Sequence, residues 1–406
     1  MKKKVLFFSP HAVHDRSAMA GHQTFNFYLK SFANDSDFEI SYVILHKNDF
    51  DYKTMHLQFN GCKDFSIRIP LFIRIYNFFH YNKGLKNLLS WYNPIYYFVS
   101  PLLLLNFIYA AKKIKNHYTP DVIVLEWTEM LFIYPQLRKI FPNSKFVSSE
   151  HDVTFIAIER KASLRMVKFA MAKKFKDLEL SLLKNMNLVL LHNYLDAERL
   201  KQFDIQSEKL LVISPFYSNH LAIYKQKKYT NNILFYGAMG RPENIQAVSW
   251  FISNVFEPYQ LYDKFTFTVV GAKGELLKNR YNYIPNLHFT GFVEDPSNYF
   301  EESLCMVAPI FQGAGIKVKV IEGMRAALPV LTTKIGMEGI SATNGISFFL
   351  CDEPYQYYNV LLALLLNVNL AKSVGSNAMK LINQDFSFEN SYKEYKQKIL
   401  SLINSH

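Results

Sequence analysis

Short apolar runs alternate with helical patterns along the whole chain, and this alternation constrains the fold more than any other feature. The first series of apolar runs predicts buried strands. They lie at Lys4–Phe8, Phe38–Leu45, Asp121–Leu125, Lys145–Ser149, Asn187–Leu191 and Leu210–Ile213. Helical patterns separate these runs, most clearly at Gly21–Phe32 and Ile158–Lys184. Strands that alternate with helices are typical of a parallel sheet covered by helices.

The alternation breaks once, in a polar, lysine-rich stretch between Ser218 and Asn232 that we interpret as an interdomain linker. A second series of apolar runs follows, at Ile233–Tyr236, Phe265–Val270, Leu287–Thr290, Leu304–Ala308, Val330–Thr332 and Ser347–Leu350. A chain of 406 residues also exceeds the size at which one hydrophobic core usually stops growing. We therefore predict an α/β fold with two doubly wound Rossmann-like domains that face each other across a cleft. They cover residues 1–218 and 219–385, and an amphipathic helix follows in 386–406.

The charge balance predicts an anionic partner. Lys and Arg number 46 against 34 Asp and Glu, which gives a formal net charge of +12 at pH 7. Phosphorylated small molecules, an anionic membrane and nucleic acid would all suit such a surface. The sequence contains no recognised nucleic-acid-binding module, so we expect no nucleic acid as partner.

The N-terminus and the cysteines predict a cytoplasmic protein. Met1–Lys4 lead directly into the first strand, which leaves no room for the hydrophobic region of a signal peptide. The three cysteines lie far apart without metal-type spacing, which favours a reducing compartment. The long apolar stretch Pro94–Ala111 falls short of the roughly 20 apolar residues of a spanning helix. Ser100 and Pro101 instead predict the N-cap and first residue of a buried helix.

The loop after Leu304–Ala308 has the features of an anion site, and ligands bind at such strand ends in open parallel sheets. Gly313 and Gly315 let a ligand approach the backbone closely. The helix that we expect to start near Ile316 would direct N–H groups toward that ligand, and Lys317 would add a positive charge. A solvated lysine over an ordinary glycine turn is the alternative.

Glu322 lies further along the same expected helix. It can receive the hydroxyl groups of a ligand, or it can pair with Lys319 three residues before it.

This segment resembles a known family. Residues 313–324, Gly-Ala-Gly-Ile-Lys-Val-Lys-Val-Ile-Glu-Gly-Met, precede Ala-Leu-Pro-Val-Leu-Thr-Thr at 327–333. The two runs are similar to the donor-binding segment of glycosyltransferases with the GT-B fold, and more narrowly to the retaining glycosyltransferase family 4 of bacterial polysaccharide synthesis. Other segments agree in order and spacing, namely 148–152, 235–244, 269–272 and 288–295.

The resemblance implies a glycosyltransferase that moves a sugar from a nucleotide-diphosphate donor, a UDP- or GDP-sugar, with retention of configuration. The acceptor would be a glycan or a polyprenyl-linked sugar in the synthesis of a cell-surface polysaccharide such as capsule or lipopolysaccharide. The resemblance implies no cofactor beyond the donor substrate. It also implies that the C-terminal helix crosses back to the first, acceptor-side domain.

Carried over position by position, the resemblance also implies the site residues. The donor-binding residues would be Gly21, Gly237, Gly271, Gly291, Phe292, Val293, Gly313, Ala314, Gly315, Ile316, Lys317 and Glu322. His151 would contact the donor sugar, and Glu322 would receive the ribose hydroxyls. Many family members carry a second glutamate where this chain has Ala314, and that departure leaves the identity of the sugar open.

The chemistry of sugar transfer also requires positive charge at the leaving phosphate. Arg241 and Lys317 are our candidates, so the catalytic set comprises His151, Arg241, Lys317 and Glu322. A satisfied core histidine is the alternative for His151. On the acceptor side we expect Glu126, at the end of its strand, and Asp152.

We predict no metal. Two Asp-x-Asp triplets are present, and such pairs can chelate a divalent ion. Asp35–Asp37 lies in a predicted helix-to-strand turn, and Asp49–Asp51 lies in a predicted polar loop. Neither is near the glycine-rich segment in the pattern.

Basic and aromatic residues are interleaved between Ile67 and Tyr97, which suits an anionic membrane surface. Further lysines follow Arg160. We interpret these segments as peripheral docking on the inner membrane face. A solvated helix face beside a partly buried aromatic flap is the alternative.

Two other functions are compatible with this sequence. A noncatalytic GT-B scaffold or sugar-binding partner is permitted by Ala314, and a nucleotide-sugar epimerase can share the architecture. An epimerase would change the donor without an acceptor, and a scaffold would tolerate the loss of Lys317 or Glu322.

Overall fold

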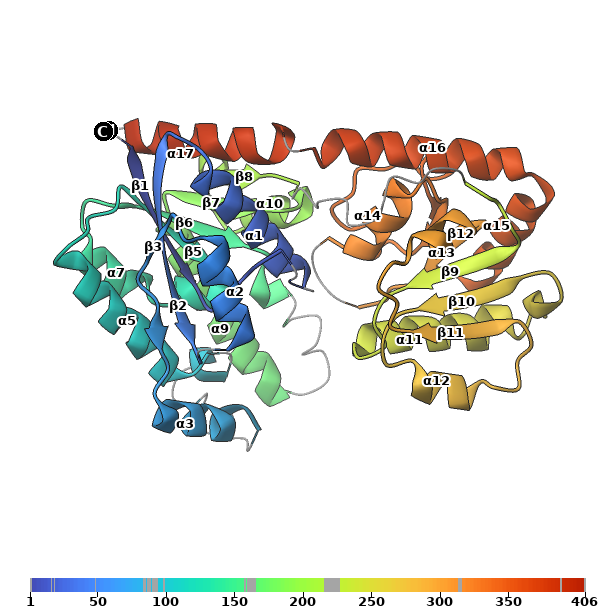
Figure 1. Cartoon of the computed structure of the whole chain (residues 1–406), viewed down its shortest axis with the longest axis horizontal. Coiled ribbons are helices and arrows are strands. Elements are labelled where there is room, and N and C mark those ends of the chain that lie inside the picture. Colours follow the sequence, from blue (N-terminus) through green and yellow to red (C-terminus); the bar gives the residue numbers. More distant parts are fainter. Residues whose placement is uncertain are drawn as a thin grey trace. The chain divides into compact units, whose positions relative to one another are not determined.

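The computed structural model describes residues 2–15, 17, 19–47, 49–82, 85, 89, 94–97, 99–156, 158, 166–214, 227–312, 316–387 and 389–404. The chain forms two compact units (Figure 1). The N-terminal unit comprises Met1–Tyr217 and Phe388–His406, and the C-terminal unit comprises Ser218–Ser387. The last segment of the chain therefore belongs to the first unit.

The N-terminal unit is built on one parallel sheet with the strand order β3-β2-β1-β5-β6-β7-β8, and β4 also pairs with β2. Its strands are β1 (Lys3–Ser9), β2 (Phe38–His46), β3 (Lys63–Asp64), β4 (Ile67–Arg68), β5 (Val122–Glu126), β6 (Lys145–Glu150), β7 (Leu188–Leu191) and β8 (Leu210–Val212). Its longer helices are α1 (Ala20–Ala33), α2 (Phe50–Gln58), α3 (Leu71–Asn82), α5 (Pro101–Lys115), α7 (Tyr134–Ile140), α9 (Met166–Lys184), α10 (Tyr194–Lys201) and α17 (Glu394–Asn404).

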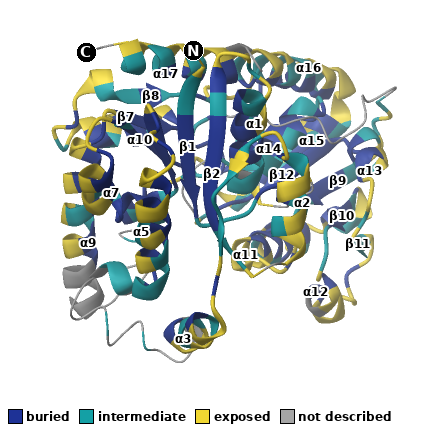
Figure 2. Ribbon diagram, turned by 60° about the vertical axis from the view of Figure 1, so that its left-hand side comes forward, coloured by how far each residue is buried: buried dark blue, intermediate teal, exposed yellow. Residues whose placement is uncertain are grey.

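The central strands of this sheet are buried on both faces (Figure 2). Along β1, Val5 and Phe7 belong to one hydrophobic cluster, and Leu6 and Phe8 belong to another. Because neighbouring side chains of a strand point to opposite faces, helices must cover both sides. This explains why the strands are continuous apolar runs in the sequence.

The C-terminal unit repeats the arrangement with the strand order β11-β10-β9-β12-β13-β14, again with parallel pairs. Its strands are β9 (Asn232–Tyr236), β10 (Thr266–Val270), β11 (Leu287–Gly291), β12 (Cys305–Ala308), β13 (Val330–Thr332) and β14 (Phe349–Leu350). Its helices are α11 (Pro242–Phe251), α12 (Glu275–Arg280), α13 (Ser297–Glu301), α14 (Val318–Arg325), α15 (Pro354–Leu366) and α16 (Val368–Asp385).

The predicted strands are confirmed, with ends that shift by one or two residues. Helix α5 begins at Pro101 with Ser100 as its N-cap, as predicted. The sequence did not predict α2, where Asp49 is the N-cap and accepts a hydrogen bond from the Tyr52 N–H. The polar loop expected at Asp49–Asp51 is therefore wrong, because a capping aspartate was interpreted as a turn residue.

The C-terminal end of the predicted linker packs against the C-terminal unit. Lys227 is half-buried, and its Nζ donates to the carbonyl oxygens of Phe300 at 3.0 Å and Ala326 at 3.3 Å. Burial lowers the pKa of Lys227 to about 7. Residues 215–226 lie outside the described part of the chain.

The C-terminal helix completes the core of the N-terminal unit. The helix predicted in 386–406 begins a few residues later than expected, as a π-helical turn at Glu389–Lys393 that leads directly into α17. Tyr395 is fully buried with its ring 5.2 Å from those of Tyr28 and Phe32. On the same helix, Lys396 Nζ lies 2.7 Å from Asp35 Oδ2.

Within the described residues, no single helix has both the length and the apolar character to cross a membrane. One sharply bent pair, Pro354–Leu366 with Val368–Asn404, meets both criteria together by length and composition alone.

Candidate functional site

The C-terminal unit brings three glycines together at the carboxyl ends of adjacent strands. Gly237 follows β9, Gly271 follows β10 and Gly291 ends β11. The N–H of Gly237 donates to the Val270 carbonyl at 2.9 Å, and the N–H of Gly271 donates to the Gly291 carbonyl at 3.1 Å. The strand order of this sheet reverses between β9 and β12, and ligands of doubly wound sheets bind at the point of reversal.

Glycine is required here by the backbone. Gly237 and Gly271 have φ angles of 155° and 151°, which side chains rarely allow. A Cβ atom on Gly271 would lie 2.2 Å from the Gly237 carbonyl oxygen. The loops after β9 and β10 are therefore packed backbone against backbone, and the Asn244 side chain lies beside Gly237, where its Nδ2 would be 2.8 Å from a Cβ atom.

The loop after β9 leads into α11 at Arg241, which is its N-cap. The N–H of Met239 donates to the Ala272 carbonyl at 2.7 Å and fixes the loop to the one after β10. The Arg241 side chain is half exposed, with Nη1 4.0 Å from Glu243 Oε1. Arg241 therefore stands at the open edge of this loop.

Helix α14, after β12, supplies the charged side chains. The helix begins at Val318 with Lys317 as N-cap, two residues after the start expected near Ile316. The extended backbone of Lys317, with φ −93° and ψ 95°, accounts for the later start. Its Nζ lies 3.8 Å from Glu338 Oε2, and only about a tenth of each side chain is exposed. Ile316 is half-buried before the helix.

Lys319 is the functional residue that sequence reasoning missed. Its Nζ donates to Asn244 Oδ1 on α11 and lies 5.1 Å from the centre of the Phe235 ring. A Cβ atom on Gly237 would lie 3.1 Å from the same Nζ. Lys319 therefore sits directly beside the glycine loop. The only sequence signal was its place two residues after Lys317, and the sequence interpretation used it only as a partner for Glu322.

The charges of Lys319 and Glu322 depend on each other. Burial lowers the pKa of Lys319 to about 8, so the side chain is still mostly protonated at pH 7. Burial raises the pKa of Glu322 to about 7, and the nearby Lys319 opposes that rise. A negatively charged ligand would favour the protonated form of Lys319.

The rest of the predicted donor segment is only partly described. Gly313, Ala314 and Gly315 lie outside the described residues. After β11, Phe292 is 79% exposed, and Val293 is half-buried. A ring so exposed next to a strand-end glycine is available to stack on a planar ligand.

The N-terminal unit has its own site at the equivalent place, between the ends of β1 and β5. The imidazole of His151 stacks on the indole of Trp127, with ring centres 4.3 Å apart and planes inclined by 24°. A Cβ atom on Gly21 would lie 3.3 Å from both His151 Nδ1 and Trp127 Nε1. The structure thus brings the predicted Gly21 and His151 into contact, and it adds Trp127, which the sequence reasoning missed.

Glu126 lies behind His151. Its side chain is fully buried, and Oε2 lies 3.1 Å from His151 Nε2. Burial raises the pKa of Glu126 to about 8 and lowers the pKa of His151 to about 3. Both pKa shifts favour the neutral form at pH 7. With both groups neutral, the carboxylic acid donates to Nε2, and the imidazole carries its hydrogen on Nδ1, the atom that faces Gly21.

Further histidines surround this pair. The His192 ring lies 5.3 Å from that of His151, and the His11 ring lies 4.9 Å from Trp127. Desolvation lowers the pKa of His11 to about 4 and that of His192 to about 3. This edge of the sheet is therefore an uncharged cluster of rings.

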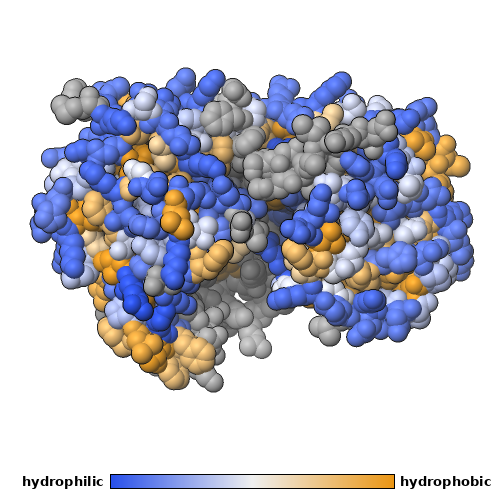
Figure 3. Space-filling model, in the orientation of Figure 1, coloured by the Kyte–Doolittle hydropathy of each residue, from blue (hydrophilic) through white to orange (hydrophobic). Residues whose placement is uncertain are grey.

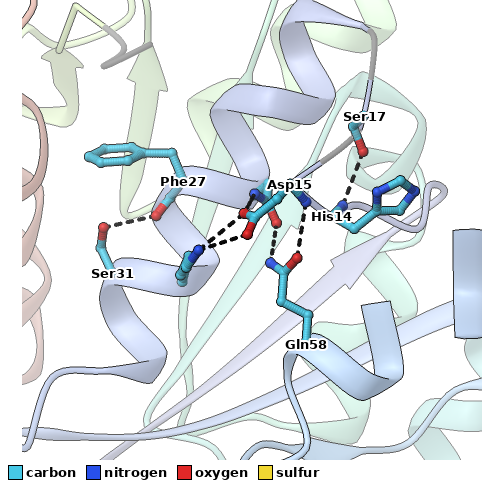
Figure 4. A network of polar contacts seen from close by, with 8 residues as sticks. His14, Asp15, Ser17, Phe27, Ser31 and Gln58 are labelled. Atoms are coloured by element: carbon cyan, nitrogen blue, oxygen red, sulfur yellow. Dashed lines mark hydrogen bonds and ion pairs between the residues drawn. The ribbon is translucent and has the colours of Figure 1, made fainter. Parts of the chain in front are cut away.

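The loop after β1 is held in place by Asp15 (Figure 4). The Asp15 carboxylate accepts hydrogen bonds from Asn26 at 2.9 Å and from Lys30 at 2.9 Å, both on α1. Its backbone N–H donates to Gln58 Oε1 at 2.9 Å, at the end of α2. These contacts fix the loop that leads to Gly21.

Buried carboxyl groups support the loop after β6. Glu150 accepts hydrogen bonds from Thr128 and Ser148, each at 2.5 Å. On α9, Glu179 accepts from the backbone N–H groups of Thr154 at 2.9 Å and Phe155 at 2.8 Å. Asp152, between them, is exposed. The loop that carries His151 is therefore anchored on both sides.

The Asp-x-Asp triplets have structural partners. Asp35 Oδ1 accepts from the Asp37 N–H at 3.0 Å, as expected for a turn. Asp51 Oδ1 lies 3.1 Å from His14 Nε2. In the described part of the chain, no three His, Cys, Asp or Glu side chains are grouped so that they could hold a metal ion.

Comparison with known proteins gives one family match. Residues 230–367 match the model of the family described as glycosyl transferases group 1. This range contains the strand-end glycines, Lys319 and Glu322.

Two curated relatives are similar to the chain. An uncharacterized 44.6 kDa protein in the cps region of Klebsiella pneumoniae is 24% identical over 196 residues, which are 43% of this chain and 50% of that protein. The chain thus spans about half the length of this relative. The uncharacterized glycosyltransferase MJ1069 of Methanocaldococcus jannaschii is 23% identical over 297 residues, which are 67% of this chain and 72% of that protein.

Among solved structures, Anabaena HepE in complex with UDP and glucose is similar over the whole of both chains. The TM-score is 0.66, and 15% of the residues are identical. The likeness confirms the predicted fold of two parallel-sheet α/β domains, the GT-B fold.

Proposed function

Since residues 230–367 form a group 1 glycosyltransferase domain within a GT-B fold, we propose that the chain transfers a sugar from a UDP-sugar to a glycan or lipid-linked acceptor. The reaction proceeds with retention and serves the synthesis of a cell-surface polysaccharide. The UDP in the complex of HepE supports the choice of base, and the cps-region relative supports the polysaccharide context.

One observation carries the proposal: Lys319 reaches the glycine loop after β9, at the point where the strand order reverses. Glycine backbone allows close approach of a diphosphate, and a lysine ammonium beside it offers a positive charge. Arg241 precedes α11, which follows β9, and Lys317 precedes α14, which follows the neighbouring strand β12. Three side-chain cations thus stabilise the charge that develops on the leaving nucleotide, without a metal ion.

The other donor contacts follow from this placement. Glu322, one turn after Lys319 on α14, receives the ribose hydroxyls, and the exposed Phe292 lies against the base. The described residues Gly237, Gly271, Gly291, Val293 and Ile316 line the donor with backbone or apolar groups. We assign Gly313, Ala314 and Gly315 to the diphosphate by their place in the sequence.

The N-terminal unit contributes the sugar contact. His151 Nδ1–H faces Gly21, where it donates to a hydroxyl group of the donor sugar. Gly21 leaves the space that the phosphates need. Glu126 is too deeply buried to touch an acceptor, so it acts by holding His151, while the exposed Asp152 remains on the acceptor side.

Release of the nucleotide tests this function. The purified full-length chain is incubated with a panel of UDP- and GDP-sugars, with and without a lipid extract from a polysaccharide-producing bacterium. We expect UDP release that requires both a UDP-sugar and the extract, and a product whose anomeric configuration matches the donor by NMR. Interconversion of the donor without the extract would indicate an epimerase. No turnover of any donor by folded protein would contradict the proposal.

A further inference from the structure

Helix α3 exposes large apolar side chains. They are Leu71 at 68%, Phe72 at 65%, Ile75 at 52%, Phe78 at 53% and Phe79 at 49% exposure. At about 100° per residue these positions fall on one face of the helix. The opposite face carries His80, which is fully buried, together with the half-buried Arg74 and Asn77.

This apolar face is a continuous patch on the molecular surface. In Figure 3 it is the hydrophobic area at the lower left, at the place of α3 in Figure 1. Taking roughly 150–200 Å² for each large side chain, half-exposure of five of them leaves on the order of 500 Å² of apolar surface. A patch of that size marks an interaction site more often than an ordinary surface.

The contacts of α3 hold it in this orientation. Ile73, on the inward face of α3, is buried, and Arg74 Nη2 donates to the carbonyl oxygen of Lys47 at 3.1 Å. The face with Ile73, Arg74 and His80 is thus turned toward the protein, which leaves the five exposed apolar residues on the outward face. A helix that only covered the core would have the reverse orientation.

The charge of the segment that contains α3 indicates the kind of partner. Between Asp64 and Asp121 the sequence contains no acidic residue. Arg68 precedes α3, Arg74 lies within it, and Lys83 and Lys86 follow it directly in the sequence. A second copy of the chain would bring the same positive charge to a symmetric contact, so this stretch disfavours self-association. The partner should offer anionic groups to the basic residues and an apolar layer to the exposed side chains of α3. A bilayer with anionic lipids has both, because its charged headgroups cover apolar acyl chains.

We propose that α3 docks the N-terminal unit on an anionic lipid bilayer. Phe72, Phe78 and Phe79 enter the boundary between headgroups and acyl chains with Leu71 and Ile75, while the exposed Arg68 binds lipid phosphates. Docking goes beyond the transfer reaction and does not depend on it, because it requires neither donor nor acceptor. If both hold, the bilayer is the surface from which a lipid-linked acceptor reaches the enzyme.

Vesicle flotation of the full-length chain tests the proposal. The probes are vesicles of phosphatidylglycerol with phosphatidylethanolamine, and vesicles of phosphatidylcholine alone. We expect binding to the first kind only, which weakens as salt is raised. The double variant Phe72→Ser/Phe79→Ser should bind about a hundredfold less or weaker still. Arg68→Glu should bind severalfold less.

The matched control is Leu366→Ser/Tyr355→Ser on α15, where the two side chains are 86% and 55% exposed. It should bind vesicles as the wild type does. Thermal melts show whether each variant is folded. If Phe72→Ser/Phe79→Ser does not fold, Arg68→Glu still tests the proposal. Equal binding to both kinds of vesicle, or undiminished binding by folded variants, would overturn the proposal. So would a dimer in solution that the double variant dissolves.

Discussion

The two sheet-edge sites of this chain occupy equivalent places in their units, but opposite kinds of residue build them. At the end of β9 the C-terminal unit presents glycine backbone and the lysines of α14. At the ends of β5 and β6 the N-terminal unit presents Trp127, His151 and a buried Glu126. The shared topology therefore gives each unit a candidate ligand site, and the side chains indicate a different kind of ligand group for each.

The difference in charge explains this division. Lys319, with a pKa of about 8, still carries its charge at pH 7 and suits a diphosphate. His151, with a pKa lowered to about 3 by burial, is uncharged and suits the hydroxyl groups of a sugar. Variants that affect one site without the other can break or sharpen this comparison.

Loss of a lysine at the glycine loop should have the largest effect. We expect Lys319→Ala to lower the rate of nucleotide release by roughly 10²–10³-fold, because it removes a preorganised charge at the leaving group. Lys317→Ala should have a similar effect. The control Lys278→Ala changes an exposed lysine on α12 and should leave the rate unchanged. A rate within a few-fold of wild type for Lys319→Ala would contradict the assignment of the phosphate site.

Tyr395→Ala should act on stability and only in the N-terminal unit. It removes a fully buried ring between Tyr28 and Phe32, which should lower the free energy of unfolding by about 3 kcal/mol. Denaturant unfolding measures the free energy of unfolding of the N-terminal unit. Nucleotide binding by the C-terminal unit should persist. Tyr355→Ala, at an exposed tyrosine, is the control. Loss of nucleotide binding in Tyr395→Ala under native conditions would show that the two sites are not separable.

Glu126 should affect catalysis through His151. Glu126→Leu removes the hydrogen bond that fixes the imidazole, and we expect kcat/KM to fall by about a hundredfold. Glu126→Gln keeps an N–H donor in the same place and should retain most of the rate. Melting curves separate this effect from unfolding.

The pH dependence distinguishes a positioning role for Glu126 from a structural one. As the pH rises through about 8, Glu126 ionises and the His151 hydrogen moves from Nδ1 to Nε2. The ratio of Glu126→Gln to wild-type kcat/KM should therefore rise above pH 8. The raised pKa also means that Glu126 costs stability increasingly as pH rises from its unfolded value to about 8, so the variant should lose less stability over that range. Parallel pH profiles for the two proteins would rule out this role.

Gly21→Ala should have the smallest effect. The new methyl group would lie 3.3 Å from His151 Nδ1 and Trp127 Nε1, so the rings must shift by a few tenths of an ångström. We expect kcat/KM to fall roughly tenfold with little change in melting temperature. Gly61→Ala is the control, since a Cβ there meets no atom within 4 Å. An equal loss of kcat/KM in both variants would mean that Gly21 does not set the shape of the sugar site.

The sequence predicted the strands well and the sites unevenly. Strands such as Lys4–Phe8 could be predicted because both of their faces are buried, which produces an unbroken apolar run. Gly237 and Gly271 were implied by the resemblance to the family, and their backbone angles, which side chains rarely adopt, explain why glycine stands there.

Residues that act through tertiary contacts were harder to recognise. Lys319 gave no local sign that it reaches Gly237, since that contact depends on the packing of α14 beside α11. The same holds for Trp127, whose stacking on His151 joins the ends of two strands. The composition of Ile67–Tyr97 suggested a membrane surface, but the periodicity of α3 is that of any amphipathic helix and does not indicate which face is buried.

The most direct test of the central claim is the thermal stabilisation of the purified chain by UDP and by GDP, compared in wild type, Lys319→Ala and Lys278→Ala. A ligand that binds only the native state raises the melting temperature. The account predicts that UDP stabilises the wild type and Lys278→Ala, and that this shift is lost in Lys319→Ala. No shift with either nucleotide in folded wild type, or an undiminished shift in Lys319→Ala, would contradict it.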